Sequence, residues 1–542
     1  MGYTDWIVLI GTLILIISYG IYKSRTSHNL EGYFLSNHDM PWYLVLLSIM
    51  GTQASAITFV SAPGQAYTDG MRFVQYYFGL PLAMIIISIV FVPVFRRLKV
   101  YTAYEFLEER FDSRTRTFTS ILFQISRGLS TGISIYAPSL ILSSLLGWNI
   151  YYTNIIMGGL LIIYTMSGGA RAVAHTQKLQ LVIIFAGMFL AGYLVVKLMP
   201  EDIHFSDALR IGGESGKMNI ITTGFEGGAF NWEDKYNIWS GLIGGLFLAL
   251  SYFGTDHSQV GRYLTAKSDK ESKLGLLMNG VVKVPMQFMI LLLGVLIFSF
   301  YQFHKAPLHF NEAQVIEAHQ TQYGAEMKKL EAAYAEVSPG DIQTKSAYRS
   351  QYTELIRKAL PGQDVNDTNY IFLRFVMDYL PEGLIGLLIA IIFLASWGSV
   401  AAALNSLAAC TMVDIHKKYW NKNLTAEKDY RYSKLYTLFW GIFCIFVAEF
   451  AGNIGNSLIE TVNILGSIFY GVILGIFLVA FWIRYIRANA LFYGALISQV
   501  LVIVVYKLNI ISFLWLNVIG CLLVIIIGSG LQKLVSQRAI RN

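Results

Sequence analysis

The chain has 542 residues, of which 55% are apolar and only 14% are charged, and its mean hydropathy is +0.52. A soluble chain of this length has about a quarter of its residues charged, so the composition excludes a soluble protein. The net charge of +7 does not indicate a nucleic-acid partner, because the basic residues lie at the ends of apolar runs, as membrane orientation requires.

Long apolar runs follow one another along the whole chain. Each has roughly 20 residues, enough to cross a bilayer as a helix, and none alternates as a barrel strand would. The first run, Ile7–Tyr22, has no basic leader and no cleavage site, so we expect a retained helix. The runs predict an all-α polytopic membrane protein with thirteen spans, at 4–23, 42–66, 74–98, 117–146, 150–167, 173–198, 238–258, 276–303, 383–411, 433–451, 458–483, 488–506 and 510–530.

The basic residues predict the orientation of these spans. An odd number of spans puts the two termini on opposite sides, and the basic clusters occupy every second connection. The positive-inside rule then places the N-terminus outside and the C-terminus in the cytoplasm. The clusters are Lys23/Arg25, Arg96/Arg97/Lys99, Arg171, Arg262/Lys267/Lys270/Lys273, Lys417/Lys418/Lys422, Arg484/Arg487 and Lys533/Arg538/Arg541.

Two connections, 199–237 and 304–382, are long, and both fall on the outer side. The second contains Glu312–Glu336, where Ala, Glu, Lys and Leu recur at helical spacing, which predicts a small helical hairpin above the membrane. A poorly ordered insertion with no role in transport is an equal alternative, since long loops cost little entropy per added residue.

Two apolar spans contain polar, glycine-bearing interruptions, at Gly51–Thr58 and at Ser251–Asp256. They lie five spans apart, as expected if spans 2–6 and 7–11 are inverted repeats that each begin with a discontinuous helix. Such a break frees backbone carbonyls, which is tolerated where they line a cavity or bind an ion. A packing kink of small residues is the alternative.

Several motifs resemble the sodium:solute symporter family, over nearly the whole chain apart from the 304–382 insertion. The motifs are Ser167–Gln180, Tyr104–Phe111 and Leu404–Asp414, with Ser130–Leu142 and Ala62–Gly70 closest to its iodide, monocarboxylate and multivitamin branch. The resemblance implies a LeuT-like fold of five plus five helices. It also implies a sodium-coupled symporter in the cell membrane that imports a sugar, sialic acid or a small organic or inorganic anion by alternating access.

The implied organisation has five parts. They are an extra N-terminal helix and cytoplasmic loop at 1–41, a first repeat at 42–198, an extracellular loop at 199–237, a second repeat at 238–484 with the 304–382 insertion, and two C-terminal helices with a cytoplasmic tail at 485–542.

The resemblance implies a site for Na⁺, the coupling ion, between spans 2 and 9. Its oxygens would be the carbonyls of Gly51, Ala54 and Ala395 and the hydroxyl of Ser399. Neutral oxygens hold a hard cation weakly enough to release it. Gly398 stands where the family commonly has a second hydroxyl, so its carbonyl, a water or Ser396 would have to substitute.

A second sodium is not expected. The family usually has aspartate where this chain has Gln177, and the serine-rich stretch that forms a second site in some relatives reads Ala401–Ala403. Both departures favour a single coupling ion.

The positions that match the family's solute pocket are Thr58, Tyr77, Ser130, Ala249 and Val462, with Tyr252 at an aromatic inner gate. They offer too few hydrogen-bonding groups to hold a hexose. Lys283 alone matches the sugar-site pattern, and an ionisable group inside a span is a functional candidate by default. It would bind an anionic group or hydroxyls of the solute; a structural lysine paired with backbone carbonyls is the alternative.

Other buried or terminal charges have simpler explanations. Arg127 and Glu460 are interpreted as structural hydrogen-bonding residues, with a role in the pocket as the alternative, and Asp256 as a solvated charge at a helix end. The alternatives to a sodium symporter are a passive or proton-coupled transporter and a symporter-like membrane sensor. A sensor would need a signalling module after the last span, where only about a dozen residues follow Leu531.

Overall fold

The computed structural model describes residues 2–24, 38–338, 340–421, 425–453 and 457–541. Side-chain surroundings are described within these ranges except at residues 17, 20–21, 23–24, 167–175 and 538–541. The described chain is helical, apart from its turns and connections and one short antiparallel hairpin of β1 (Phe225–Glu226) and β2 (Ala229–Phe230).

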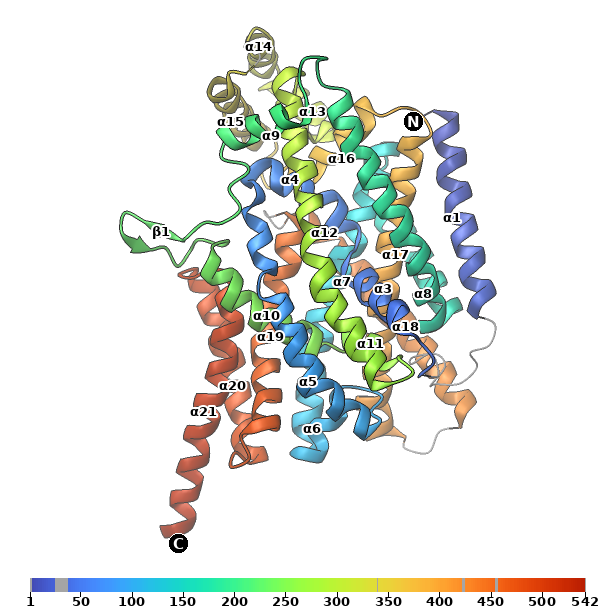
Figure 1. Ribbon diagram of the computed structural model, residues 1–542, viewed down its shortest axis with the longest axis vertical. Coiled ribbons are helices and arrows are strands. Elements are labelled where there is room, and N and C mark those ends of the chain that lie inside the picture. Colours follow the sequence, from blue (N-terminus) through green and yellow to red (C-terminus); the bar gives the residue numbers. More distant parts are fainter. Residues whose placement is uncertain (1, 25–37, 339, 422–424, 454–456, 542) are drawn as a thin grey trace.

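The helices run nearly parallel to the long axis, with the two termini at opposite ends (Figure 1). In chain order they are α1 (Tyr3–Ser24), α3 (Trp42–Gln53), α4 (Ala56–Asp69), η2 (Met71–Tyr77), α5 (Leu80–Leu98), α6 (Glu105–Arg110), α7 (Ser113–Leu146), α8 (Ile150–Lys197), α9 (Phe205–Glu214), η3 (Ser240–Gly244), α10 (Gly245–Gly254), α11 (His257–Leu264), α12 (Asp269–Phe303), α13 (Glu312–His319), α14 (Gly324–Ala335), α15 (Ile342–Ala359), η4 (Thr368–Tyr370), α16 (Ile371–Tyr379), α17 (Leu384–Cys410), η5 (Thr411–Trp420), α18 (Ala426–Ala448), η6 (Ala451–Asn453), α19 (Leu458–Trp482), α20 (Ala488–Leu508) and α21 (Phe513–Arg541).

Eight helices among the described residues are long and apolar enough to cross a membrane, or nine if the bent pair α3 and α4 counts as one span. Three shorter apolar helices, Tyr3–Ile16, Ile150–Met166 and Ser240–Gly254, coincide with the predicted first, fifth and seventh spans. The all-helical membrane class is confirmed, and the exact number of thirteen spans stays a prediction.

The predicted fifth and sixth spans form one assigned helix, α8, that is sharply bent. The Tyr164 hydroxyl lies 2.7 Å from the Thr176 hydroxyl. Twelve residues of straight helix would separate them by about 18 Å, so the two halves of α8 fold towards each other. The bend lies between Tyr164 and Thr176, and the side chains of residues 167–175 of the Ser167–Gln180 motif lie outside the described ones.

Both predicted interruptions are present as helix breaks. The chain bends by 62° between α3 and α4, at Ala54 and Ser55, which belong to neither helix. The second break separates α10 from α11, which Asp256 caps by accepting a hydrogen bond from the Ser258 amide at 2.7 Å. The broken pairs lie at the start of each predicted repeat, as an inverted-repeat transporter requires.

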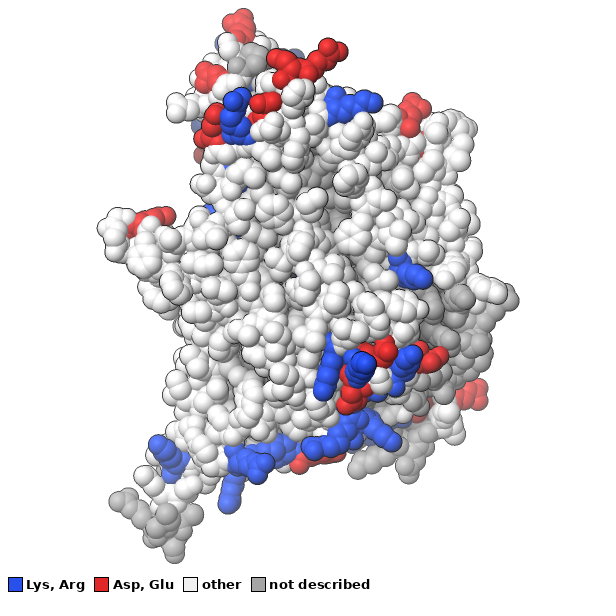
Figure 2. Space-filling view, viewed as in Figure 1, with Lys and Arg blue, Asp and Glu red and all other residues white. Residues whose placement is uncertain are grey.

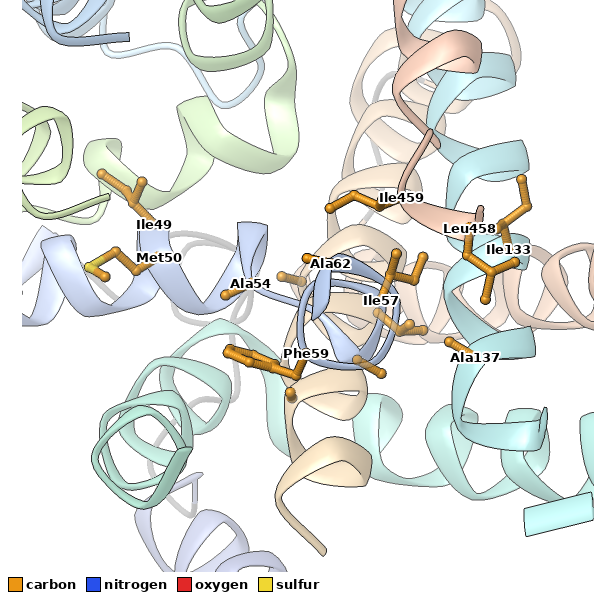
Figure 3. Packing of buried hydrophobic residues seen from close by; sticks show 14 of the residues in the cluster. Ile49, Met50, Ala54, Ile57, Phe59, Ala62, Ile133, Ala137, Leu458 and Ile459 are labelled. Atoms are coloured by element: carbon orange, nitrogen blue, oxygen red, sulfur yellow. The ribbon is translucent and has the colours of Figure 1, made fainter. Parts of the chain in front are cut away.

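The core gathers around α17 and α4. In the most apolar 18-residue stretch of α17, 89% of the residues are buried. The helix contacts α1, α3, α7 and α8. Figure 3 shows how α4 meets α7 and α19 through small and branched apolar side chains. The labelled ones include Ile57, Ala62, Ile133, Ala137, Leu458 and Ile459. Close approach of this kind holds membrane helices together, since lipid is as apolar as they are.

Three helices of the insertion, α13, α14 and α15, pack together, and η4 and α16 follow them, so the predicted hairpin over 312–336 is incomplete. The third helix, α15, packs with α13 and α14 around a separate apolar cluster that includes Met327, Tyr352 and Ile356. The predicted hairpin stopped at Glu336 because the polar composition of α15 hides its apolar face. All three helices lie at the same end of the molecule as the N-terminus (Figure 1).

Charged residues gather at the two ends of the molecule and leave a wide band almost free of charge between them (Figure 2). At the end that carries the C-terminus, lysine and arginine predominate. Such a band is what a bilayer requires of a spanning protein.

Candidate functional site

The break between α3 and α4 frees the two carbonyls that were expected to face sodium. In a continuous helix Gly51 and Ala54 would accept from the amides of Ser55 and Thr58. Instead the Ser55 amide donates to Gln53 at 3.1 Å and the Thr58 amide to Ser55 at 3.0 Å. The Gly51 and Ala54 carbonyls therefore lose their helical partners at the bend.

The opposite wall is α17, which contacts both α3 and α4. Ala395, Gly398 and Ser399 are all buried there. The Ser399 hydroxyl donates to the Ser396 carbonyl at 3.1 Å, which uses its hydrogen and leaves its oxygen lone pairs able to accept a cation. The hydroxyl of Ser396 donates to the Ser134 carbonyl on α7 at 3.1 Å, away from this wall.

The side chain of Gln177 bridges the two walls. Its amide nitrogen donates to the Gly398 carbonyl at 3.1 Å and lies 3.4 Å from the Thr52 hydroxyl. Its amide oxygen accepts from the Ser48 hydroxyl at 3.1 Å. A Cβ on Gly51 would stand 2.9 Å from its Cγ. The amide thus lies against the expected sodium position, and it offers that position no charge.

Lys283 is fully buried in the middle of α12 and has no hydrogen-bond partner among the described residues. Its amine lies 5.7 Å from the centre of the Tyr77 ring. The helix η2, which carries Tyr77, contacts both α12 and α10, so the elements that hold the predicted solute residues Tyr77, Lys283 and Tyr252 meet. The alternative of a lysine paired with backbone carbonyls has no such bond to support it.

One turn along α12, Gln287 is a residue that the sequence analysis missed. It is buried, and neither its amide nitrogen nor its oxygen has a partner among the described residues. Residues four apart share a face of a helix, so Lys283 and Gln287 form one unpaired polar stripe. The four-residue spacing of two polar residues in an apolar run was a signal that could have revealed it.

Arg127 was interpreted as structural, and its place in the bundle is close to the same group. Its guanidinium lies 5.8 Å from the centre of the Tyr252 ring, and its Nε has no hydrogen-bond partner among the described residues. Tyr252 accepts a hydrogen bond from Gln259 at 2.7 Å. Tyr77 and Tyr252 therefore each have a buried cation near their ring.

The other predicted solute positions are less informative. Thr58 on α4, Ser130 on α7 and Ala249 on α10 are buried, and Val462 on α19 is half-buried. The Ser130 hydroxyl donates to the Ser126 carbonyl of its own helix at 2.8 Å. Within the described residues no hydrogen bond joins Thr58 or Ser130 to Lys283.

Asp256 is buried, which corrects the expectation of a solvated charge. Its carboxylate caps α11 and accepts a hydrogen bond from the Tyr470 hydroxyl at 2.7 Å. Tyr470 comes from α19, 214 residues away, so no local pattern could reveal this partner. The residue anchors the second helix break to α19.

A cavity of about 330 Å³ lies at the N-terminal ends of η2 and α19. Arg72 pairs there with Asp69 and with Asp234, and Lys235 pairs with Glu460. None of the predicted solute residues lines this cavity. Its walls are Gln65, Asp69, Arg72, Glu233, Asp234, Lys235, Tyr236 and Glu460.

Two motifs singled out in the sequence meet in space. Asp414, which ends the Leu404–Asp414 motif, accepts hydrogen bonds from Thr102 and Ser120 at 2.7 and 2.9 Å. It also pairs with Arg116, which in turn pairs with Glu108 of the Tyr104–Phe111 motif. The motifs thus form a network that ties α6, α7 and η5 together.

The sequence model of the sodium:solute symporter family matches residues 33–329 and 348–501. The chain belongs to the sodium:solute symporter family. Curated relatives include the sodium/sialic acid symporters NanT of Aliivibrio fischeri and SiaT of Proteus mirabilis, which are 27% and 26% identical over 97% of this chain and over 92% and 94% of their own lengths. The sodium-coupled monocarboxylate transporter 1 of Xenopus laevis is 26% identical over 88% of this chain and 68% of its own length.

A solved Na⁺-coupled sialic acid symporter, substrate-bound and outward-open, shares the fold. Its TM-score is 0.78 at 24% identity, and 98% of each chain is covered. The LeuT-like fold is therefore confirmed. As a member of the family, this protein is a multi-pass sodium-coupled symporter of a small solute, not an enzyme, and Na⁺ is its coupling ion.

Proposed function

We propose that this symporter imports a small organic anion together with one Na⁺. The observation that carries the choice of solute is Lys283, a buried amine that no described residue pairs. A charge inside a membrane protein costs several kcal/mol unless it is compensated. An anionic solute would supply that compensation during part of the transport cycle.

The surroundings of Lys283 favour an organic anion over a bare ion. Tyr77 presents its ring to the amine, and Gln287 adds an unpaired amide one turn along α12. Aromatic walls with a few polar groups are typical of sites for small organic molecules. Sialic acid and monocarboxylates, which the relatives' names give as their solutes, are both carboxylates.

The proposed sodium site comprises the carbonyls of Gly51, Ala54, Ala395 and Gly398 and the hydroxyl of Ser399. The freed carbonyls at the α3–α4 break support this assignment, as does the free acceptor capacity of Ser399. The Gly398 carbonyl accepts from the Gln177 amide and, inside the continuous helix α17, from the amide four residues on, so it would reach Na⁺ only where Gln177 releases it.

The N-terminus is proposed to lie outside, and the C-terminus in the cytoplasm, of a plasma or inner membrane. The support is the concentration of lysine and arginine at the C-terminal end (Figure 2), since cytoplasmic surfaces carry the excess of basic residues. On this orientation the insertion is extracellular. No nucleic-acid partner is proposed, because membrane orientation accounts for the basic residues. The five-part organisation proposed from the sequence is compatible with both helix breaks.

A stoichiometry of one sodium per solute is expected. Gln177 occupies the space between α3 and α17 as a neutral amide and satisfies Ser48 and Gly398 by itself, so a second cation would find no carboxylate there. Initial uptake against sodium concentration should give a Hill coefficient close to one. A coefficient clearly above one, or a reversal potential that fits two ions, contradicts the prediction.

The solute class is tested in proteoliposomes. Purified protein is given labelled monocarboxylates, sialic acid, sugars, amino acids and inorganic anions, with an inward gradient of sodium or of potassium. Accumulation of one or more organic anions in sodium alone is expected. Preferential accumulation of a neutral sugar would remove the proposal, and uptake that is equal in potassium would contradict sodium coupling.

A further inference from the structure

A second cavity, of about 510 Å³, lies where α19 turns into α20 and meets the end of α21. Three cations, Arg484, Arg487 and Lys533, line it, and no acidic side chain does. None of the three takes part in an ion pair among the described residues. Tyr485, Gln532, Ser536 and Gln537 complete the wall.

The cavity is held in shape by hydrogen bonds that do not use its cations. Buried Gln532 accepts from the Arg487 amide at 2.9 Å and so joins the start of α20 to α21. The Tyr485 hydroxyl donates to the Ser529 hydroxyl at 2.6 Å, and Arg110 donates to the Arg484 carbonyl at 3.1 Å. These bonds hold the backbone of the cavity wall in place and leave the charged groups of Arg484, Arg487 and Lys533 available to a ligand.

The ends of the neighbouring helices add to the positive potential. α20 begins at Ala488 without a side-chain cap, so its first amide groups have no intrahelical partner and carry the positive end of the helix dipole. Figure 2 shows lysine and arginine gathered at this end of the molecule, next to the uncharged band. The cavity therefore suits a ligand with a concentrated negative charge.

The surfaces beside the cavity indicate a ligand with a long apolar part. In α20 and in α21, only 39% of the residues in the most apolar 18-residue stretch are buried, as expected of helices that face lipid. Leu534 and Val535 are exposed next to Lys533, and Trp482 and Tyr485, at and just after the end of α19, are each 56% exposed. Aromatic residues in this position are typical of the headgroup boundary of a bilayer.

We propose that this cavity binds the phosphate of an anionic phospholipid, whose acyl chains lie along the outer faces of α20 and α21. Basic pockets between membrane helices on the cytoplasmic side are suited to such headgroups. The shared chemistry, a phosphate oxyanion, is also present in free phosphate and glycerol phosphate. The apolar flank favours the lipid, because a free anion would gain nothing from it.

The test uses the full-length protein in a neutral detergent and native mass spectrometry. Phosphatidylglycerol is titrated against the wild type and against a variant with Arg484→Ala, Arg487→Ala and Lys533→Ala, with phosphatidylcholine as the neutral lipid. Each cation near the surface contributes about fivefold, so the triple variant should bind phosphatidylglycerol roughly 100-fold more weakly. Binding of phosphatidylcholine should not change.

The matched control removes three positive charges from the same end of the molecule. Lys267→Ala, Lys270→Ala and Lys273→Ala lie outside the cavity and should leave phosphatidylglycerol binding as in the wild type. Equal loss in both triple variants, or wild-type binding by the cavity variant, would overturn the proposal. If the cavity variant does not fold, Arg484→Gln alone should still show a fivefold loss.

Two soluble arms separate the possible sources of the phosphate. Inorganic phosphate and glycerol 1-phosphate are titrated as competitors of phosphatidylglycerol, and neither should displace it at millimolar concentration. Displacement of the lipid by free phosphate at its own binding concentration would overturn the assignment to a lipid. The outcome is independent of the transported solute, because the cavity shares no residue with the sodium or solute positions.

Discussion

Lys283→Ala is expected to weaken solute binding by about 1–3 kcal/mol, roughly 5- to 150-fold, the cost of losing a hydrogen bond to a charged group. The amine has no described partner in the bundle, so its removal leaves no orphaned acceptor behind and should spare the fold. Sodium binding should remain nearly intact. Solute affinity and melting temperature are measured on the same purified variant.

A matched control lies farther along the same helix. Ser299 is also buried on α12, and its hydroxyl is paired with the Ala208 carbonyl at 2.7 Å, so Ser299→Ala should keep wild-type affinity. Lys283→Met retains the apolar stem without the charge and should resemble Lys283→Ala. A destabilised Lys283→Ala protein with unchanged affinity would show that the lysine is structural.

Ser399→Ala is expected to raise the sodium concentration for half-maximal uptake about fivefold, since losing one oxygen contact costs about 1 kcal/mol. The maximal rate at saturating sodium should change little. The hydroxyl now donates within its own helix, so the substitution leaves only the Ser396 carbonyl without this donor and should not unfold α17.

Ser396→Ala is the control for this experiment. Ser396 lies three residues before Ser399 on α17, and its hydroxyl donates to the Ser134 carbonyl on α7. Loss of this hydroxyl should not alter the sodium dependence. If Ser396→Ala shifts the sodium dependence and Ser399→Ala does not, the two hydroxyls have been assigned the wrong way round. Unchanged dependence in both would leave the site to carbonyls alone.

The sequence predicted the fold well where a residue conflicts with lipid. Glycine, serine and threonine in the middle of an apolar run, as at Gly51–Thr58, have no place in a lipid-facing helix, so the break was predictable. The burial of Lys283 away from lipid was predictable for the same reason, because a lysine inside a span has no lipid-facing explanation. Such signals are local, and they need no knowledge of what lies opposite.

Partners that are distant in the sequence could not be predicted. Gln177 reaches Thr52 and Gly398 across 125 and 221 residues, and Asp256 accepts a hydrogen bond from Tyr470 across 214 residues. The helix α15 was missed because a single apolar face, marked by Tyr352 and Ile356, is diluted by many polar residues. These outcomes depend on tertiary packing, which single-sequence patterns do not contain.

The insertion packs closely against α4, backbone against backbone. A Cβ on Gly64 of α4 would stand 1.9 Å from the Thr368 carbonyl of η4, and Arg349 of α15 lies over the Tyr67 ring and pairs with Asp367. Any reorientation of α4 during transport is therefore expected to move η4 and α15 with it. A fluorophore on the exposed face of α15 would read the transport cycle from outside the membrane, far from the ion and the solute.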